Sequence, residues 1–233
     1  MQFLQVNCLP KIQQANLIKK LRPRSCLELK KNGETQNGFF TVYDNQNNSI
    51  PVYCDMTSET HSAWTLVMSW SLRNNELFKK ASLTVDTPVN DKTPNWNLYR
   101  MTHAQMSSIQ SHSTHWRSTC SFNTHAVDYT DYMRGNFRDF NILSYVGTGQ
   151  CKKVDYINIR SNAATSTTAR FWQSVHWMLH VGSSHTGCPF QVLANRGATS
   201  SEDNFGFYGA VNPKFRCTAS ADSTTQYWFG GYE

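Results

Sequence analysis

A short hairpin bracketed by two cysteines is the feature that most constrains the fold of this chain. Residues 38–43 have the aromatic and β-branched composition of a strand, residues 44–49 form a polar turn cluster, and residues 50–53 return as an antiparallel partner. A hairpin of this size brings its ends near each other, which is the proximity that a disulfide between Cys26 and Cys54 requires. We therefore expect a small, disulfide-linked β module near the start of the chain.

The remainder of the chain shows further strand patterns. Residues 64–70 open on Trp64 and have the composition of a buried strand, and residues 154–160 alternate clearly, which indicates a half-buried strand. We expect another strand or a short helix within residues 171–181 and a last strand at residues 225–229.

A capping box predicts a helix over residues 102–109, because Thr102 is followed three positions later by Gln105. Residues 71–100 are rich in Asn and Pro and are expected to be irregular, and the chain from residue 195 to the last strand is expected to be loop-like. The short segment from Gly147 to Gly149 lacks the context of a dinucleotide site and is interpreted as a turn before Cys151.

Cysteine usage favours an oxidising compartment. The chain has seven cysteines and no Cys-x-x-Cys pair, which disfavours a zinc ribbon or a thioredoxin-like site. Six of them lie in the body at spacings that fit three local disulfides, each stabilising the fold by roughly 3 to 4 kcal/mol in the chain-entropy model. Their order suggests the pairs Cys26–Cys54, Cys120–Cys151 and Cys188–Cys217, although other pairings are compatible with the sequence. The alternative is a set of reduced core thiols.

Charge is concentrated near the N-terminus. The formal net charge is +6, and seven of the 22 basic residues fall within residues 1–31 beside a single acid, Glu28. Because the rest of the chain is balanced, we expect no nucleic-acid partner. No run of about 18 apolar residues is present, so no membrane span is expected. The motifs Gly-x-Ser-x-Gly, the P-loop and His-Glu-x-x-His are also absent, and we expect no enzymatic activity.

Residues 26–70 resemble the opening of fibrinogen C-terminal-related domains, including the intelectin-like branch. The resemblance is carried by Cys26-Leu-Glu-Leu, Asn37-Gly-Phe-Phe-Thr-Val-Tyr, Pro51-Val-Tyr-Cys-Asp-Met-Thr and Trp64-Thr-Leu-Val. The chain looks most like divergent invertebrate members, such as the fibrinogen-like proteins of cnidarians and coral skeletal matrices. The resemblance implies an α+β fold in which a small disulfide-linked N-terminal β subdomain precedes a mixed twisted sheet with short helices and long C-terminal loops.

Residues 1–25 form a basic N-terminal segment, and residues 26–233 form the fibrinogen-like domain. Pro10 suits the first position of a short helix and Pro23 would end it. Family members commonly follow oligomerising segments, so Cys8 is a candidate for an intermolecular disulfide in a homo-oligomer. The alternative is a frayed tail with a free thiol. Residues 1–9 do not show the pattern of a secretory signal peptide, so the expectation of a secreted, extracellular protein rests on the cysteines and the resemblance.

Calcium is the best ionic candidate. Glu202, Asp203 and Asn204 supply adjacent oxygen ligands on an expected loop, with Gly206 nearby. This is the region in which fibrinogen-related domains carry their calcium loop, and the alternative is a solvated acidic turn. The histidine pairs His112/His115 and His176/His180 have no local third ligand, so we interpret them as ordinary packing or surface residues.

The dense aromatics of the same region predict a ligand pocket. Related lectins use aromatic walls beside calcium to bind glycans, and Tyr208 and Tyr227 are the candidate ligand-binding residues, whereas Phe207 and Trp228 are expected in the core. Asn47 opens the sequon Asn47-Asn-Ser and is a candidate glycosylation site on the hairpin turn.

The sequence therefore predicts a secreted, non-enzymatic recognition module that binds glycans or extracellular glycoproteins with the help of calcium. The alternative is a structural extracellular-matrix protein without a defined small ligand, driven by the basic tail, the disulfides and self-association.

Overall fold

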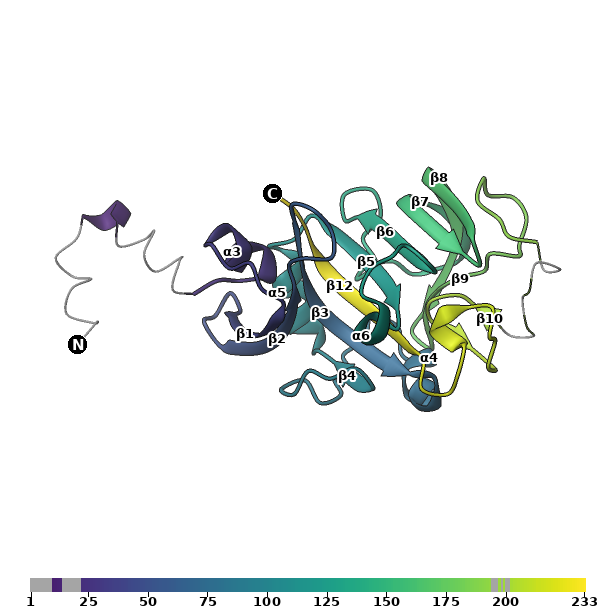
Figure 1. Ribbon diagram of the computed structural model, residues 1–233, viewed down its shortest axis with the longest axis horizontal. Coiled ribbons are helices and arrows are strands. Elements are labelled where there is room, and N and C mark those ends of the chain that lie inside the picture. Colours follow the sequence, from purple (N-terminus) through teal and green to yellow (C-terminus); the bar gives the residue numbers. More distant parts are fainter. Residues whose placement is uncertain (1–9, 14–21, 194–196, 198, 200–201) are drawn as a thin grey trace.

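The computed structural model describes residues 10–13, 22–193, 197, 199 and 202–233. Within these residues, one antiparallel sheet of ten strands dominates the fold, in the order β1-β2-β3-β12-β5-β6-β7-β8-β9 with β4 paired to β3 (Figure 1). The strands of this sheet are β1 (Gly38–Tyr43), β2 (Ser49–Asp55), β3 (Ser62–Ser71), β4 (Leu98–Arg100), β5 (His115–Cys120), β6 (Tyr132–Asn136), β7 (Gly147–Ile159), β8 (Asn162–Ser174), β9 (Trp177–Val181) and β12 (Thr224–Tyr232).

The helices in this part of the chain are short. They are α3 (Cys26–Lys31), α4 (Asn75–Lys79), α5 (His103–Gln110) and α6 (Phe122–His125), with the 3-10 turns η1 (Leu72–Asn74) and η3 (Arg216–Thr218). A second, two-stranded sheet is formed by β10 (Glu202–Asp203) and β11 (Phe207–Tyr208). The structure is thus a mostly antiparallel α+β fold. The expectation of a mixed sheet is wrong, because every strand pair among the described residues is antiparallel.

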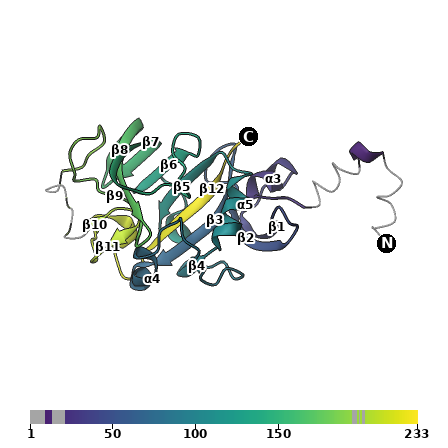
Figure 2. The same ribbon diagram turned by 180° about the vertical axis from the view of Figure 1, so that it is seen from behind.

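The N-terminal module, which comprises α3, β1 and β2, confirms the predicted hairpin and its disulfide. Gly38 pairs with Cys54 at one end of the hairpin and Tyr43 pairs with Ser49 at the other. Cys26 opens α3 and is bonded to Cys54 with a Cα–Cα distance of 5.5 Å. The disulfide therefore fastens the helix to the base of the hairpin. In Figures 1 and 2 the module lies at the N-terminal end of the domain.

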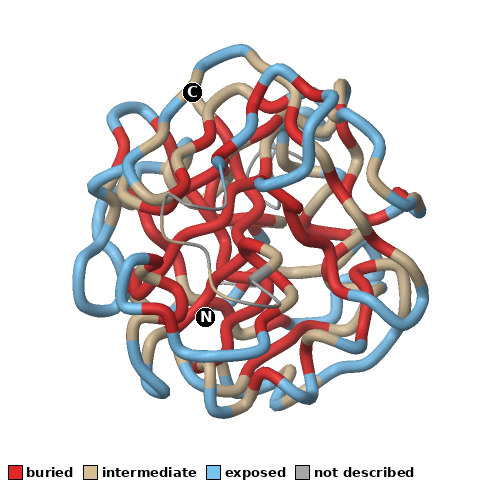
Figure 3. The backbone as a smooth tube through the Cα atoms, turned by 90° about the vertical axis from the view of Figure 1, so that its right-hand side faces the viewer, coloured by how far each residue is buried: buried red, intermediate tan, exposed pale blue. Residues whose placement is uncertain are grey.

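The centre of the sheet is formed by β3 and β12, which pair with each other. Every residue of β3 is buried, as expected for a strand that is covered on both faces. In the view of Figure 3, buried backbone lies in the middle of the domain with exposed loops around it. The helix α5 begins at the predicted capping box, in which the Thr102 side chain accepts from the Gln105 amide and the Gln105 side chain accepts from the Thr102 amide.

A fully buried arginine joins the N-terminal module to the main sheet. Arg117 on β5 donates to Asp55 of β2 and to Glu59, each at 2.5 Å. Its guanidinium also lies between two tryptophan rings, 4.6 Å from the centroid of Trp64 and 5.0 Å from that of Trp228. The carboxylates accept from the two terminal nitrogens of the guanidinium, and the aromatic faces add cation–π contacts.

The other two predicted disulfide pairs are wrong. Cys120 is bonded to Cys217, with a Cα–Cα distance of 4.4 Å, and Cys151 is bonded to Cys188 at 5.7 Å. The reason is the strand order: β12 pairs with β5, and Thr225 lies opposite Cys120 in that register, so the chain just before β12 returns to the end of β5. Cysteines that are neighbours in sequence therefore belong to different disulfides.

The predicted strands at residues 64–70, 154–160 and 225–229 lie within β3, β7 and β12, and residues 171–181 span the end of β8 and all of β9. The interpretation of Gly147–Gly149 as a turn is wrong, because β7 begins at Gly147 and carries a bulge between Thr148 and Gln150. The irregular region 71–100 contains α4 and β4. Cys8 lies outside the described residues. None of the helices in the described ranges combines the length and apolar composition that a bilayer crossing requires.

Candidate functional site

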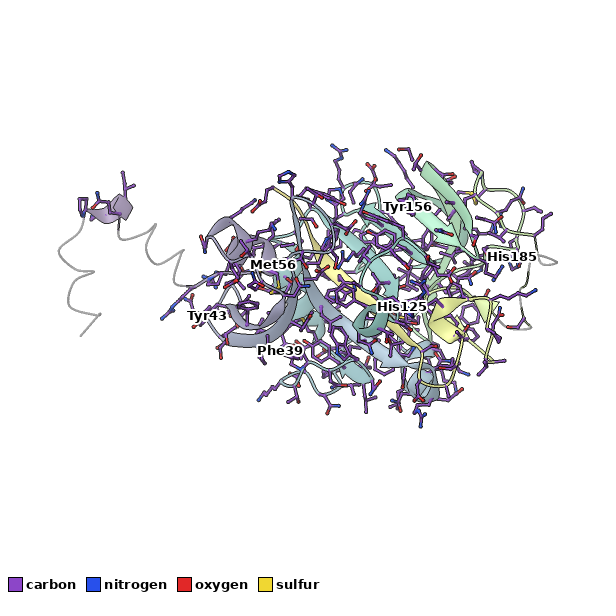
Figure 4. The ribbon with its side chains drawn as sticks, viewed as in Figure 1. Phe39, Tyr43, Met56, His125, Tyr156 and His185 are labelled. Atoms are coloured by element: carbon purple, nitrogen blue, oxygen red, sulfur yellow. A yellow bond between two sulfur atoms is a disulfide. The ribbon has the colours of Figure 1, made fainter. Side chains whose placement is uncertain are left out.

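A pocket with aromatic walls lies at the end of the domain opposite the N-terminal module. We call it the aromatic pocket; its volume is about 260 Å³ and it is lined by Trp172, Trp177, His180, His185, Asp203 and Phe207. These residues come from β8, β9, the loop after β9, β10 and β11. Figure 4 shows His185 at this end, far from Phe39 and Tyr43 of the N-terminal module.

The rings of the aromatic pocket contact one another. Trp172 is stacked on His180 with a centroid distance of 5.9 Å and an interplanar angle of 2°, and it also meets His185 at 4.9 Å. Phe207 lies 5.5 Å from His180. Trp177 is 44% exposed at the start of β9. The pocket therefore offers an aromatic wall in which Trp177 and His185 are open to solvent.

Two glycines make room for Trp172. Gly149, in the β7 bulge, has a φ of +90°, and a Cβ there would come within 2.6 Å of Cζ2 of Trp172. A Cβ at Gly182 would collide with the other edge of the same ring. Gly149 thus serves both the bulge backbone and the packing of the indole, because side chains are rarely tolerated at positive φ.

The neutral form of His180, which burial favours, presents an acceptor to the pocket. Burial lowers its pKa and outweighs the hydrogen bond to Met178 and the charge of Asp203, both of which act in the opposite direction. Its Nδ1 donates to the backbone oxygen of Met178 at 2.7 Å, since a carbonyl oxygen can only accept. Nε2 is then unprotonated, and it is a hydrogen-bond acceptor on a ring that lines the pocket.

Long-range links fix the segments that form the pocket. The Cys151–Cys188 disulfide connects β7 to the chain after β9. The small sheet β10–β11 is attached to β9 through paired backbone hydrogen bonds of 2.9 Å between Val181 and Asn204. The pocket is therefore assembled by contacts between parts of the chain that are distant in sequence.

Two of the three candidate calcium ligands, Asp203 and Asn204, point to different sides. Asp203 lines the aromatic pocket, whereas Asn204 is buried and its Oδ1 accepts from the Ser183 hydroxyl at 2.7 Å. Successive residues of an extended segment point to opposite sides, which separates these two side chains. The side chain of Glu202 lies outside the described residues. Within the described ranges, no group of three or more His, Cys, Asp and Glu side chains is arranged to hold a metal ion.

The tyrosines predicted to bind ligand are core residues, and that prediction is wrong. Tyr208 and Tyr227 are 1% and 0% exposed. The Tyr227 hydroxyl donates to the backbone oxygen of Phe205 at 3.1 Å, and the Tyr208 hydroxyl lies 3.2 Å from that of Thr225. Strand alternation explains the error, because on β11 the residue that faces the pocket is Phe207, which was expected in the core. Trp228 is buried as predicted.

Sequence reasoning missed Trp172, Trp177 and His185 as wall residues. Trp172 and Trp177 lie on either side of the tight turn between β8 and β9, and the two tryptophans five residues apart were the only signal that the sequence offered. These two tryptophans line the same pocket as Phe207 because the small sheet β10–β11 is attached to β9. No local sequence pattern encodes that attachment.

Of the remaining candidate positions, His180 lines the aromatic pocket, whereas Asn47, His112, His115 and His176 do not. Asn47 is exposed on the β1–β2 turn, where its Oδ1 accepts from Arg24 at 2.9 Å. His112 contacts Glu28 at 3.0 Å, and His115 lies 3.6 Å from Asp155. His176 is exposed in the β8–β9 turn, while His180 belongs to the pocket. The two histidine pairs therefore form no shared site.

No protein-family model matches this chain, and the search of curated proteins finds no match either. The functional argument therefore rests on the chemistry of the site.

Proposed function

We propose that this chain is a secreted, non-enzymatic recognition module of the fibrinogen-related type, and that it binds glycans in the aromatic pocket. The single observation that carries the proposal is the aromatic wall of Trp172, Trp177 and Phe207 beside the acceptor groups of Asp203 and His180. Aromatic faces pack against the C–H faces of a sugar ring while acceptors bind its hydroxyl groups. The location of the site is revised from the tyrosines to this pocket.

The three disulfides support an extracellular location, because disulfides persist mainly in oxidising compartments. The exposed sequon at Asn47 fits the same setting. It lies on the turn of the N-terminal module, away from the aromatic pocket, so a glycan attached there would leave the pocket accessible.

A glycan array probed with calcium and with chelator tests the proposal. We expect binding to a restricted set of glycans. If the array signal is the same in chelator as in calcium, glycan binding does not require calcium. Absence of binding under both conditions would overturn the proposed function.

One observation favours a structural matrix role as the second candidate. Strand β1 is an edge of the large sheet, and Phe39 on it is 66% exposed and contacts Tyr53 with a ring-centroid distance of 5.2 Å. An exposed, aromatic edge strand is suited to self-association. Sedimentation of the wild-type chain and of Phe39→Lys separates the two functions: concentration-dependent assembly that the substitution abolishes would favour the matrix role.

A further inference from the structure

The three disulfides differ in their exposure to solvent. Cys151 is exposed on β7, whereas its partner Cys188 is 4% exposed. The cysteines of the other two disulfides, Cys26–Cys54 and Cys120–Cys217, are each at most 2% exposed. Thiol exchange begins when an external thiolate reaches a sulfur atom, so access favours attack at Cys151.

A cation lies beside both halves of the exposed disulfide. Arg170 on β8 is the register partner of Cys151. Its guanidinium also reaches the chain next to Cys188, because a Cβ built on Gly187 would lie 2.5 Å from Nη2 of Arg170. Positive charge attracts an incoming thiolate and stabilises the thiolate that leaves, so this setting favours exchange.

The exposed disulfide anchors the loop after β9, which carries one wall residue of the aromatic pocket. Residues 184–187 of this loop are exposed, and the ring of His185 lies 4.9 Å from that of Trp172, measured between centroids. Backbone hydrogen bonds to β8 hold the chain at Gly182 and again at Phe190. Opening the disulfide therefore frees the stretch that bears His185, while both ends of that stretch stay attached to the sheet.

We propose that Cys151–Cys188 is a thiol-exchange site, at which a low-molecular-weight thiol of the glutathione type opens the disulfide and frees His185 from the wall of the aromatic pocket. The thiolate attacks Sγ of Cys151, the bond to Cys188 breaks, and the electron pair leaves on the Cys188 sulfur, which takes a proton. A second thiolate attacks the glutathione sulfur of the mixed disulfide and releases Cys151. Two thiols are thereby oxidised to one disulfide, and both cysteines are reduced to thiols.

The exchange is tested on the full chain, after any free thiol has been blocked. Reduced glutathione is added, and the cysteines that open are identified over time by differential alkylation and mass spectrometry. We expect Cys151 and Cys188 to open at least about tenfold faster than the other four, with the first glutathione adduct on Cys151. Simultaneous opening of all three disulfides, slower opening of this one, or a first adduct on Cys188 would overturn the proposal.

The variant Arg170→Gln isolates the contribution of charge. It should slow the opening of the folded chain by about threefold or more, because the cation beside the disulfide is lost. Arg22→Gln is the matched control, since Arg22 lies against Tyr43 in the N-terminal module, and it should open at the wild-type rate. In urea all three chains should open at the same rate. Equal rates in the folded chains would overturn the argument from charge.

The release of the loop is measured without any ligand. In the double variant Cys151→Ser with Cys188→Ser, the ring protons of His185 should leave the ring current of Trp172, and their NMR resonances should shift toward those of a free histidine. The resonances of His125, which is exposed on α6, should not change. Unchanged resonances of His185 would overturn the release of the loop, and thermal unfolding verifies that the variant is folded.

The consequence for binding rests on the proposed glycan-binding function. A glycan that binds the wild-type chain on the array should bind the double variant about threefold or more weakly, because one wall residue of the pocket is displaced. Equal affinity would overturn the link between the disulfide and the pocket. A blank array for the wild-type chain would overturn the proposed function, whereas the results on exchange and on the His185 resonances would stand.

Discussion

The N-terminal module and the aromatic pocket lie at opposite ends of one sheet and are held by contacts of different range (Figures 1 and 2). The module is closed by neighbouring strands and by a disulfide that spans 28 residues. The pocket joins β8, β9 and β11, and its loop is tied by a disulfide to β7. The comparison teaches that the N-terminal module is encoded by local sequence patterns, whereas the pocket depends on the topology of the sheet.

The two ends also differ in chemistry. At the junction of the N-terminal module, charge is buried and fully committed, since Arg117 is paired with Asp55 and Glu59. At the aromatic pocket, Trp177 and His185 are exposed, and the wall is open to solvent. The buried ion pairs at the junction therefore contribute to stability, whereas the open wall of the pocket is suited to recognition, and the following experiments test that difference.

The largest expected effect concerns the Cys120–Cys217 disulfide, which closes the longest of the three loops, with a separation of 97 residues. Replacing both cysteines with Ala should lower the free energy of unfolding by about 5 kcal/mol in the chain-entropy model. The same double substitution at Cys26 and Cys54 should cost about 3.5 kcal/mol, since that loop is shorter. Urea unfolding measures both, and a larger loss for the shorter loop would contradict the ranking.

Removal of the buried arginine should weaken the junction between the N-terminal module and the main sheet. Arg117→Ala leaves the buried carboxylate of Asp55 without its cation, while Glu59 keeps its ion pair with Arg134, and we expect urea unfolding to show a loss of about 3–5 kcal/mol in the free energy of unfolding. Arg73→Ala removes only an exposed ion pair with Asp222 and is the control, with an expected change of less than about 1 kcal/mol. Similar losses of stability in the two variants would show that Arg117 does not hold the N-terminal module to the main sheet.

A pair of glycine substitutions compares the two ends directly. Gly149→Ala introduces a side chain at positive φ and displaces Trp172, so we expect a loss of about 1–3 kcal/mol in stability and weaker glycan binding. Gly33, after α3, has a φ of +102° with no heavy atom within 4 Å of a built Cβ. Gly33→Ala should therefore share the backbone strain and leave binding unchanged. Weaker binding in Gly33→Ala would contradict the separation of the two ends.

The smallest expected effect is a dependence of stability on pH at the N-terminal junction. Burial acts to raise the pKa of Asp55, but the Arg117 ion pair and the hydrogen bonds from Ser58 outweigh it, and the pKa is lowered. Because the folded-state pKa lies below the unfolded value of about 3.9, this carboxylate contributes stability above that pH and loses it as the pH falls through the folded-state pKa. Urea unfolding between pH 6 and pH 2.5 should show that the free energy of unfolding falls less steeply with decreasing pH in Asp55→Asn than in the wild type. An unchanged slope would exclude this carboxylate as a source of the pH dependence.

Local patterns in the sequence were sufficient to predict the N-terminal module and α5. The alternation of the hairpin, the position of Cys26 and Cys54, and the capping box at Thr102 each act within a few tens of residues. The other disulfides required knowledge that β12 lies between β3 and β5, and the chain gives no local signal of that insertion.

From the sequence, the wrong side chains of β11 and β12 were assigned to a ligand pocket, since Tyr208 and Tyr227 are buried and Phe207 lines the aromatic pocket. Phe207 and Tyr208 are adjacent on β11, so a shift of one residue decides which ring is in the core and which is in the pocket. The sequence alone does not fix that choice for a two-stranded sheet whose partner, β9, precedes it by more than twenty residues.

Calorimetric titration of a glycan that binds the wild-type chain on the array into Trp177→Ala and Phe39→Ala tests the central claim most directly, because each variant removes one exposed aromatic ring, from opposite ends of the domain. The account predicts at least a tenfold weaker affinity for Trp177→Ala and an unchanged affinity for Phe39→Ala. Wild-type affinity in Trp177→Ala, or a loss in Phe39→Ala, would contradict it.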